Sequence, residues 1–93
     1  MIKVTVYEKT DSYCVHCEQM RAVMDEWLNR NPDVEVSVVT FSIEENLELM
    51  MEYGFNSAPV YVIESEEVVT MTSGNNPDLL IDALENRNSI WDD

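Results

Sequence analysis

The chain has 93 residues, which lies within the usual size of one domain, about 50 to 200 residues, so we expect a single domain spanning 1–93. Nineteen acidic and five basic residues give a formal charge of −14 at pH 7, which disfavours binding to nucleic acid or to an anionic membrane. No apolar run approaches the roughly 18 to 20 residues of a membrane span, and the N-terminal residues lack a signal-peptide pattern, so we expect a cytoplasmic protein.

The first part of the chain predicts a strand, a helix and a second strand. Residues 2–7 are rich in β-branched residues and alternate in character, which predicts a strand. After a polar loop, apolar residues three and four positions apart predict a helix from Cys14 to about Arg30, with Met20, Met24, Trp27 and Leu28 on its buried side. The segment 31–33 contains a proline that ends the helix. Residues 34–39 alternate again, which predicts a second strand.

The next elements are a helix and a hairpin. Ser42, followed by Glu45 three residues later, has the pattern of a capping box and predicts a second helix that ends at Gly54. Two short β-rich runs, 60–63 and 68–72, are separated by polar residues and predict a β-hairpin.

The last element is a third helix, with Asn76 as N-cap and Pro77 at its first position. We expect the tail, 88–93, to be loose. The resulting order is βαβαββα, which predicts an α/β domain with a four-stranded mixed sheet flanked by three helices.

Both cysteines lie in one segment, Cys14-Val15-His16-Cys17, where the loop after the first strand enters the first helix. In a reducing compartment this spacing favours redox or metal chemistry over a structural crosslink, and a disulfide closing so small a ring would constrain the unfolded chain little. A thiolate at a helix N-terminus is stabilised by unpaired N–H groups and the helix dipole. We therefore expect Cys14 to be the nucleophile and Cys17, one turn later, to resolve the mixed disulfide.

His16 lies between the two sulfurs in sequence. A protonated imidazole near Cys14 would lower the pKa of that thiol, and the alternative is that His16 only points into solvent. Because His16 is the only histidine and there is no second cysteine pair, one chain does not supply the four ligands of a structural zinc site, and we expect no metal. A metal cluster shared between two chains is the alternative.

Three segments in order carry a family resemblance: Cys14-Val15-His16-Cys17, the Gly-Phe-Asn-Ser-Ala-Pro-Val run at 54–60, and the Ser-Gly-Asn-Asn-Pro-Asp run at 73–78. Together they resemble the glutaredoxin-like proteins of the NrdH-redoxin group, in the thioredoxin superfamily. The resemblance implies a thioredoxin fold in which the Ala58–Pro59 bond is cis and faces the sulfurs. From the residues alone, Pro59 would be an ordinary strand-opening proline.

The resemblance also implies a substrate-binding surface around the sulfurs, made of Tyr13, Val15, Ser57, Ala58, Pro59, Gly74 and Asn75. Tyr13 either contacts substrate or packs on its own loop, and Gly74 either admits a partner's backbone or only forms a turn. Glu8 stands where thioredoxins keep a buried acid, but we expect it to be an exposed glutamate at a strand end.

The activity implied is that of a monomeric thiol-disulfide oxidoreductase whose redox group is the Cys14–Cys17 disulfide, with no other cofactor. Members of the group are reduced by thioredoxin reductase and donate electrons to ribonucleotide reductase. A glutathione-dependent glutaredoxin is the first alternative, disfavoured because anionic glutathione needs basic side chains and this chain has few. An iron–sulfur or regulatory binding module without turnover is the second.

Overall fold

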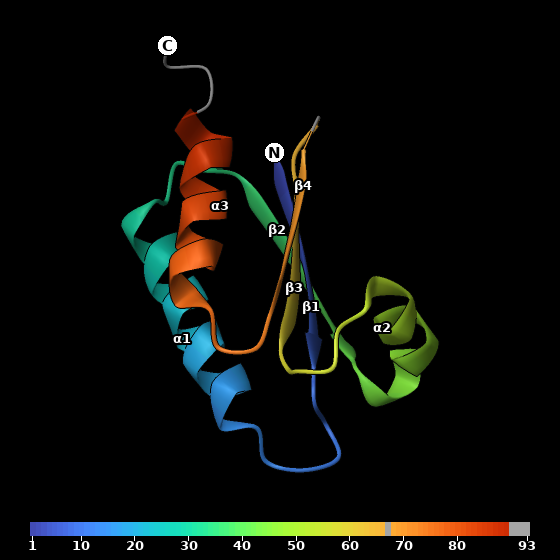
Figure 1. Ribbon diagram of the computed structural model, residues 1–93. Helices are drawn as coiled ribbons and strands as arrows, with labels where there is room; N and C mark the ends of the chain where they lie inside the picture. The colour runs from blue at the N-terminus through green and yellow to red at the C-terminus, as the bar shows by residue number, and fades with distance from the viewer. Residues whose placement is uncertain (67, 90–93) are drawn as a thin grey trace.

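The computed structural model describes residues 1–66 and 68–89 (Figure 1). They form four strands, three α-helices and one 3₁₀ turn: β1 Ile2–Glu8, α1 Val15–Arg30, β2 Val36–Ser42, η1 Glu44–Asn46, α2 Leu47–Tyr53, β3 Val60–Glu64, β4 Val69–Ser73 and α3 Pro77–Ser89. The order of elements is the one that the sequence predicts. None of the described helices is long and apolar enough to cross a bilayer.

The four strands form one mixed sheet in the order β2-β1-β3-β4. β1 pairs with β2 in parallel and with β3 antiparallel, and β3 pairs with β4 antiparallel. Helices α1 and α3 cover one face of the sheet, and α2 covers the other (Figure 1). The predicted four-stranded mixed sheet flanked by three helices is therefore confirmed.

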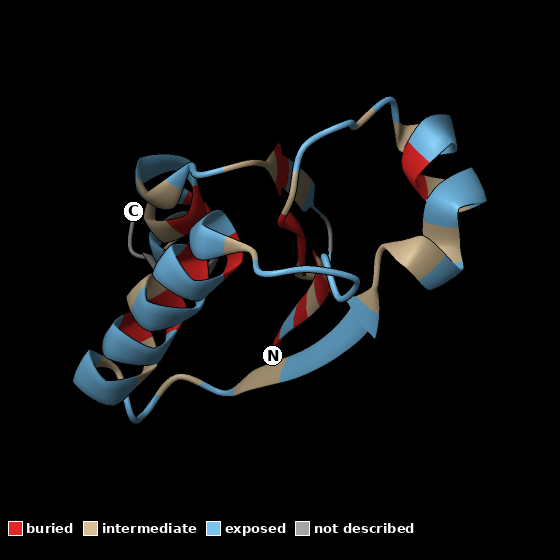
Figure 2. Ribbon diagram, turned by 90° about the horizontal axis from the view of Figure 1, so that it is seen from below, coloured by how far each residue is buried: buried red, intermediate tan, exposed pale blue. Residues whose placement is uncertain are grey.

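Each face of the sheet has its own apolar core, because successive residues of a strand point to opposite faces. Under α1 and α3, the buried side chains of the strands include Val4, Val6, Tyr61 and Ile63, packed against Met20, Trp27, Leu80 and Leu84 of the helices. Under α2, a smaller cluster contains Tyr7, Met50, Val60 and Val62. Figure 2 shows that most of β2 and the outer faces of the helices are exposed. The larger core thus anchors the helix that begins at the two cysteines.

The second strand lies later in the chain than expected, at Val36–Ser42 instead of 34–39. Its register with β1 explains the shift, because Ile2 pairs with Val36 and Glu8 pairs with Ser42, so β2 is paired along its whole length. The N–H of Val34 is used elsewhere, since it donates to the carbonyl of Asn31 in the turn after α1.

The predicted capping box at Ser42 and Glu45 is wrong. Ser42 ends β2, and its hydroxyl contacts Thr10 and the Glu44 carboxylate instead of capping a helix. A 3₁₀ turn follows, and α2 begins only at Leu47. The other end of the helix agrees with the sequence: Gly54 has φ +79° and donates its N–H to Met51 O at 3.1 Å.

The third helix begins at Pro77, as predicted, and the carbonyl of Asn76 accepts the N–H of Leu80. The helix continues through Ser89 and so includes residues 88 and 89, the first two of the tail that we expect to be loose. The rest of the expected tail, 90–93, lies outside the described residues.

Candidate functional site

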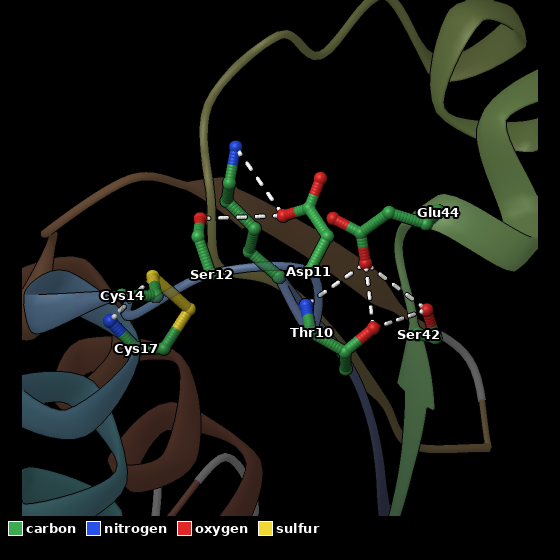
Figure 3. A network of polar contacts seen from close by, with 8 residues as sticks. Thr10, Asp11, Ser12, Cys14, Cys17, Ser42 and Glu44 are labelled. Carbon is green, nitrogen blue, oxygen red and sulfur yellow. Dashed lines mark hydrogen bonds and ion pairs between the residues drawn. A yellow bond between two sulfur atoms is a disulfide. The ribbon is translucent and has the colours of Figure 1, made fainter.

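Cys14 and Cys17 form a disulfide at the N-terminus of α1, with their Cα atoms 5.2 Å apart (Figure 3). Cys14 is the N-cap residue, and the backbone N–H of Cys17 donates to the Cys14 Sγ at 3.2 Å. Cys17 is buried, whereas Cys14 is half-buried. In the reduced form, the same N–H and the helix dipole would favour a thiolate at Cys14, the more accessible of the two sulfurs.

The Ala58–Pro59 peptide bond is cis, as the resemblance implies. Pro59 is buried, Ala58 is half-buried and Ser57 is exposed. The carbonyl of Pro59 accepts the N–H of Gly74 at 2.9 Å, and a Cβ added at Gly74 would lie 3.6 Å from the Cβ of Ser57. The structure therefore brings Ser57, Pro59 and Gly74 together, at the end of the sheet where α1 begins (Figure 1).

Gln19 of α1 connects the helix that carries the cysteines to the loop before α3, which contains Gly74 and Asn75. The sequence analysis did not identify this residue. Its Oε1 accepts a hydrogen bond from Asn75 Nδ2 at 2.9 Å and lies 3.4 Å from His16 Nδ1. The backbone N–H of Asn76 also contacts the sulfur of the buried Met20, at 3.3 Å. The spacing of Gln19 three residues after His16 predicts that both share one side of the helix. Its contact with Asn75, 56 residues away, depends on the packing of α3 against α1.

The side chains around the cysteines are exposed. His16 and Val15 both lie at the surface of the first turn of α1. Tyr13 is 74% exposed, and its hydroxyl donates to Glu18 Oε2 at 2.6 Å. This hydrogen bond to a carboxylate is the main reason that the pKa of Tyr13 is raised. The ring of Tyr13 is thus largely exposed, and its contact with substrate stays a prediction.

Glu8 is not the exposed strand-end glutamate that we expected. Its side chain is 13% exposed, and Arg21 of α1 covers it with two hydrogen bonds, from Nη2 at 2.7 Å and from Nε at 3.3 Å. The ion pair raises the pKa of Arg21. The neighbouring Tyr61 is buried. Its burial, followed by the negative charge of Glu8, raises the pKa of its hydroxyl to about 12. Packing of α1 across the end of β1 explains the difference, because it brings the guanidinium over the carboxylate.

The loop that leads to Cys14 is fastened to the start of η1 (Figure 3). Glu44 Oε1 accepts hydrogen bonds from the Thr10 hydroxyl at 2.7 Å, the Thr10 N–H at 2.8 Å and the Ser42 hydroxyl at 3.1 Å. These bonds, with that from the Thr10 hydroxyl the largest cause, lower the pKa of Glu44 to about 2. The Glu44 carboxylate is thus ionised at neutral pH and holds the loop against the end of β2.

Among the described residues, no group of three histidine, cysteine or acidic side chains is placed to hold a metal ion. The chemistry that the site offers is that of its two sulfurs. A disulfide with a half-buried cysteine at a helix N-terminus and a buried second cysteine is suited to thiol-disulfide exchange.

Comparison with known proteins gives similarities of both sequence and fold. The thioredoxin of Methanocaldococcus jannaschii is 31% identical over 87 residues, covering 94% of this chain and 99% of that protein. Reduced desulfothioredoxin from Desulfovibrio vulgaris Hildenborough is 29% identical, with a TM-score of 0.67 over 91% of this chain and 80% of that chain. Oxidised mitochondrial thioredoxin 3 from Saccharomyces cerevisiae has a TM-score of 0.69 over 91% and 77%, at 20% identity. No protein-family model matches the chain. The similarities confirm the predicted thioredoxin fold.

Proposed function

Since the chain belongs to the thioredoxin family and is a thiol-disulfide oxidoreductase, we propose that it is a dithiol redoxin of the NrdH-redoxin type that donates electrons to ribonucleotide reductase. A thioredoxin reductase-like enzyme would return it to the dithiol form. The observation that carries the proposal is the Cys14–Cys17 disulfide at the N-terminus of α1, with Cys14 the accessible sulfur. No redox group other than this disulfide is part of the proposal.

In the proposed mechanism, the Cys14 thiolate attacks one sulfur of the substrate disulfide. A bond forms between the two sulfurs, the substrate S–S bond breaks, and the leaving thiolate takes a proton from solvent. Cys17 then loses its proton and attacks the Cys14 sulfur, which releases the second substrate thiol. Two electrons pass to the substrate, and the Cys14–Cys17 disulfide is formed again.

The surrounding residues have supporting roles in this proposal. His16, exposed on the first turn of α1, adds positive charge near Cys14 when it is protonated and so favours the thiolate. The cis bond before Pro59 orients Ser57 and Ala58, whose backbone groups can pair with an extended substrate segment. Tyr13, Val15 and the loop of Gly74 and Asn75 contact the substrate on either side.

The charge of the chain favours a redoxin over a glutathione-dependent glutaredoxin. Glutathione is anionic, and its carboxylates are held by basic side chains or helix N-terminal N–H groups. Three of the five basic side chains are already paired with acids: Lys9 with Asp11, Arg21 with Glu8, and Arg30 with Glu26. A glutathione site would therefore have few cations to draw on.

Coupled oxidation of NADPH tests the proposed electron source. With oxidised ribonucleotide reductase as the acceptor, we expect turnover with thioredoxin reductase to exceed turnover with glutathione and glutathione reductase by at least about tenfold, equivalent to about 1.4 kcal/mol. Omission of the chain measures the background rate. Efficient turnover with glutathione alone would contradict the proposal, and failure of both systems would remove ribonucleotide reductase as the acceptor.

Replacement of Gly74 by alanine tests the role of its loop, and Gly54 provides a matched control. Both glycines have positive φ, +74° and +79°, where an alanine costs about 1 to 2 kcal/mol, so both variants should lose similar stability in urea denaturation. Only Gly74 lies beside Ser57, so only Gly74→Ala should also lower kcat/KM for a protein disulfide. Equal activity of the two variants would show that Gly74 only forms a turn.

A further inference from the structure

A groove of about 440 Å³ lies between α2 and the loop that leads to Cys14. We call it the α2 groove and define it by Leu47, Met51, Phe55, Ser57 and Ala58, which line it. Most of its side chains are apolar. The groove does not include the two cysteines, and the exchange mechanism assigns no role to the α2 side chains that line it.

Two large apolar side chains of the groove face water. Leu47 is 56% exposed and Met51 is 78% exposed, although both belong to a helix whose other side is packed on the sheet. Their spacing of four residues places them together on one side of α2. An exposed apolar pair at the edge of a groove is typical of a surface that binds a partner, and the flexible methionine adapts to side chains of different shape.

The groove shares two residues, Ser57 and Ala58, with the surface that we expect to bind substrate. Ser57 and Ala58 line it and directly precede Pro59, whose carbonyl is bonded to Gly74. Its opposite wall includes Asp11, in the loop that Thr10 and Glu44 fasten and that leads to Cys14 (Figure 3). A substrate chain that extends along Ala58 can therefore place a neighbouring side chain in the groove.

The charge beside the groove selects the partner. Glu45, Glu48 and Glu52 are exposed along the adjoining side of η1 and α2, on a chain with a formal charge of −14. Lys9, the cation at the groove, lies 3.6 Å from Asp11 and so adds little net positive charge. A second copy of this chain would bring the same acids and be repelled, whereas lysine or arginine side chains would be attracted.

We propose that the α2 groove binds the segment of the substrate protein that flanks its disulfide, and that this segment carries a large apolar side chain next to lysine or arginine. The apolar side chain contacts Leu47 and Met51, and the basic residues face Glu48 and Glu52. This inference rests on the proposed function, because it names the class of disulfide that the same site reduces.

Reduction of four cyclic disulfide peptides with dithiothreitol as the electron source tests the inference. The peptides share one ring and differ in the flanking pair: leucine with lysine, leucine with glutamate, serine with lysine, or serine with glutamate. Each kcat/KM, corrected for the direct reaction of dithiothreitol, is divided by the kcat/KM for bis(2-hydroxyethyl) disulfide, a small uncharged disulfide without a large apolar side chain. We expect the leucine-lysine peptide to exceed the serine-glutamate peptide by at least about tenfold, with the difference decreasing at high salt.

Variants of the groove connect this preference to its residues. Leu47→Ser with Met51→Ser should remove the advantage of the leucine-containing peptides, and Glu48→Gln with Glu52→Gln should remove the preference for lysine. Val69→Ser is the matched control, because Val69 is 54% exposed at the end of β4 remote from Pro59 and should leave every ratio unchanged. Thermal melting confirms that each variant is folded.

Equal rates for the four peptides would overturn the inference, as would groove variants that behave like Val69→Ser. Because dithiothreitol supplies the electrons, the result does not depend on the physiological reductase or on ribonucleotide reductase. Failure of the proposed partners and failure of the α2 groove are thus separate results.

Discussion

Replacing Cys17 by serine is expected to stop turnover after one attack and to leave the substrate joined to the chain through Cys14. The sulfur of Cys14, the less buried cysteine, still forms the mixed disulfide, but the serine hydroxyl does not displace the substrate from it. We expect steady-state reduction of a protein disulfide to fall at least about 100-fold, while a covalent complex accumulates to about one per chain. Non-reducing electrophoresis followed by mass spectrometry measures the complex and identifies the joined cysteines.

Cys14→Ser is the control for this experiment, because it leaves only the buried sulfur of Cys17 and should form no complex. Alkylation of the reduced wild-type chain provides a second measurement. Iodoacetamide should modify Cys14 before Cys17, since the N–H of Cys17 points at the Cys14 sulfur and Cys14 is the more exposed. Earlier modification of Cys17, or a complex formed by Cys14→Ser, would reverse the assigned roles.

Leu80→Ala is expected to lower the free energy of unfolding by about 2 to 5 kcal/mol, the range for truncation of a buried leucine. Leu80 is fully buried in the core that α3 shares with α1, in the cluster that includes Met20 and Leu84. Truncation leaves a cavity behind the helix that carries the cysteines. Urea denaturation followed by circular dichroism measures the loss. A lower midpoint at an unchanged m value shows that the free energy of unfolding has fallen.

The neighbouring residue is the control for this change. Leu79 is 39% exposed on the same helix, so Leu79→Ala should cost less than about 1 kcal/mol. A similar loss in both variants would mean that the effect comes from the helix and not from the core. The comparison therefore tests the burial pattern that distinguishes the two sides of α3.

Local patterns in the sequence were sufficient to predict the order of elements and the position of the cysteine pair. Strand alternation, helical periodicity and the positive-φ glycine at Gly54 are encoded within a few residues, so they are visible without the fold. The placement of Cys14 at a helix N-terminus follows from the same local information. The cis bond before Pro59 came from the family resemblance, because the residues alone favoured an ordinary strand-opening proline.

The tertiary structure alone decided which distant side chains meet. Ser42 looked like a helix cap, but Thr10, which is 32 residues away, engages its hydroxyl, and Glu8 is covered by Arg21 instead of lying exposed. Gln19 reaches Asn75 across 56 residues. Such contacts depend on how helices pack on the sheet, and local periodicity carries no information about that packing. The chemistry of the two sulfurs was therefore visible in the sequence, whereas the surface that would receive a substrate was visible only in the fold.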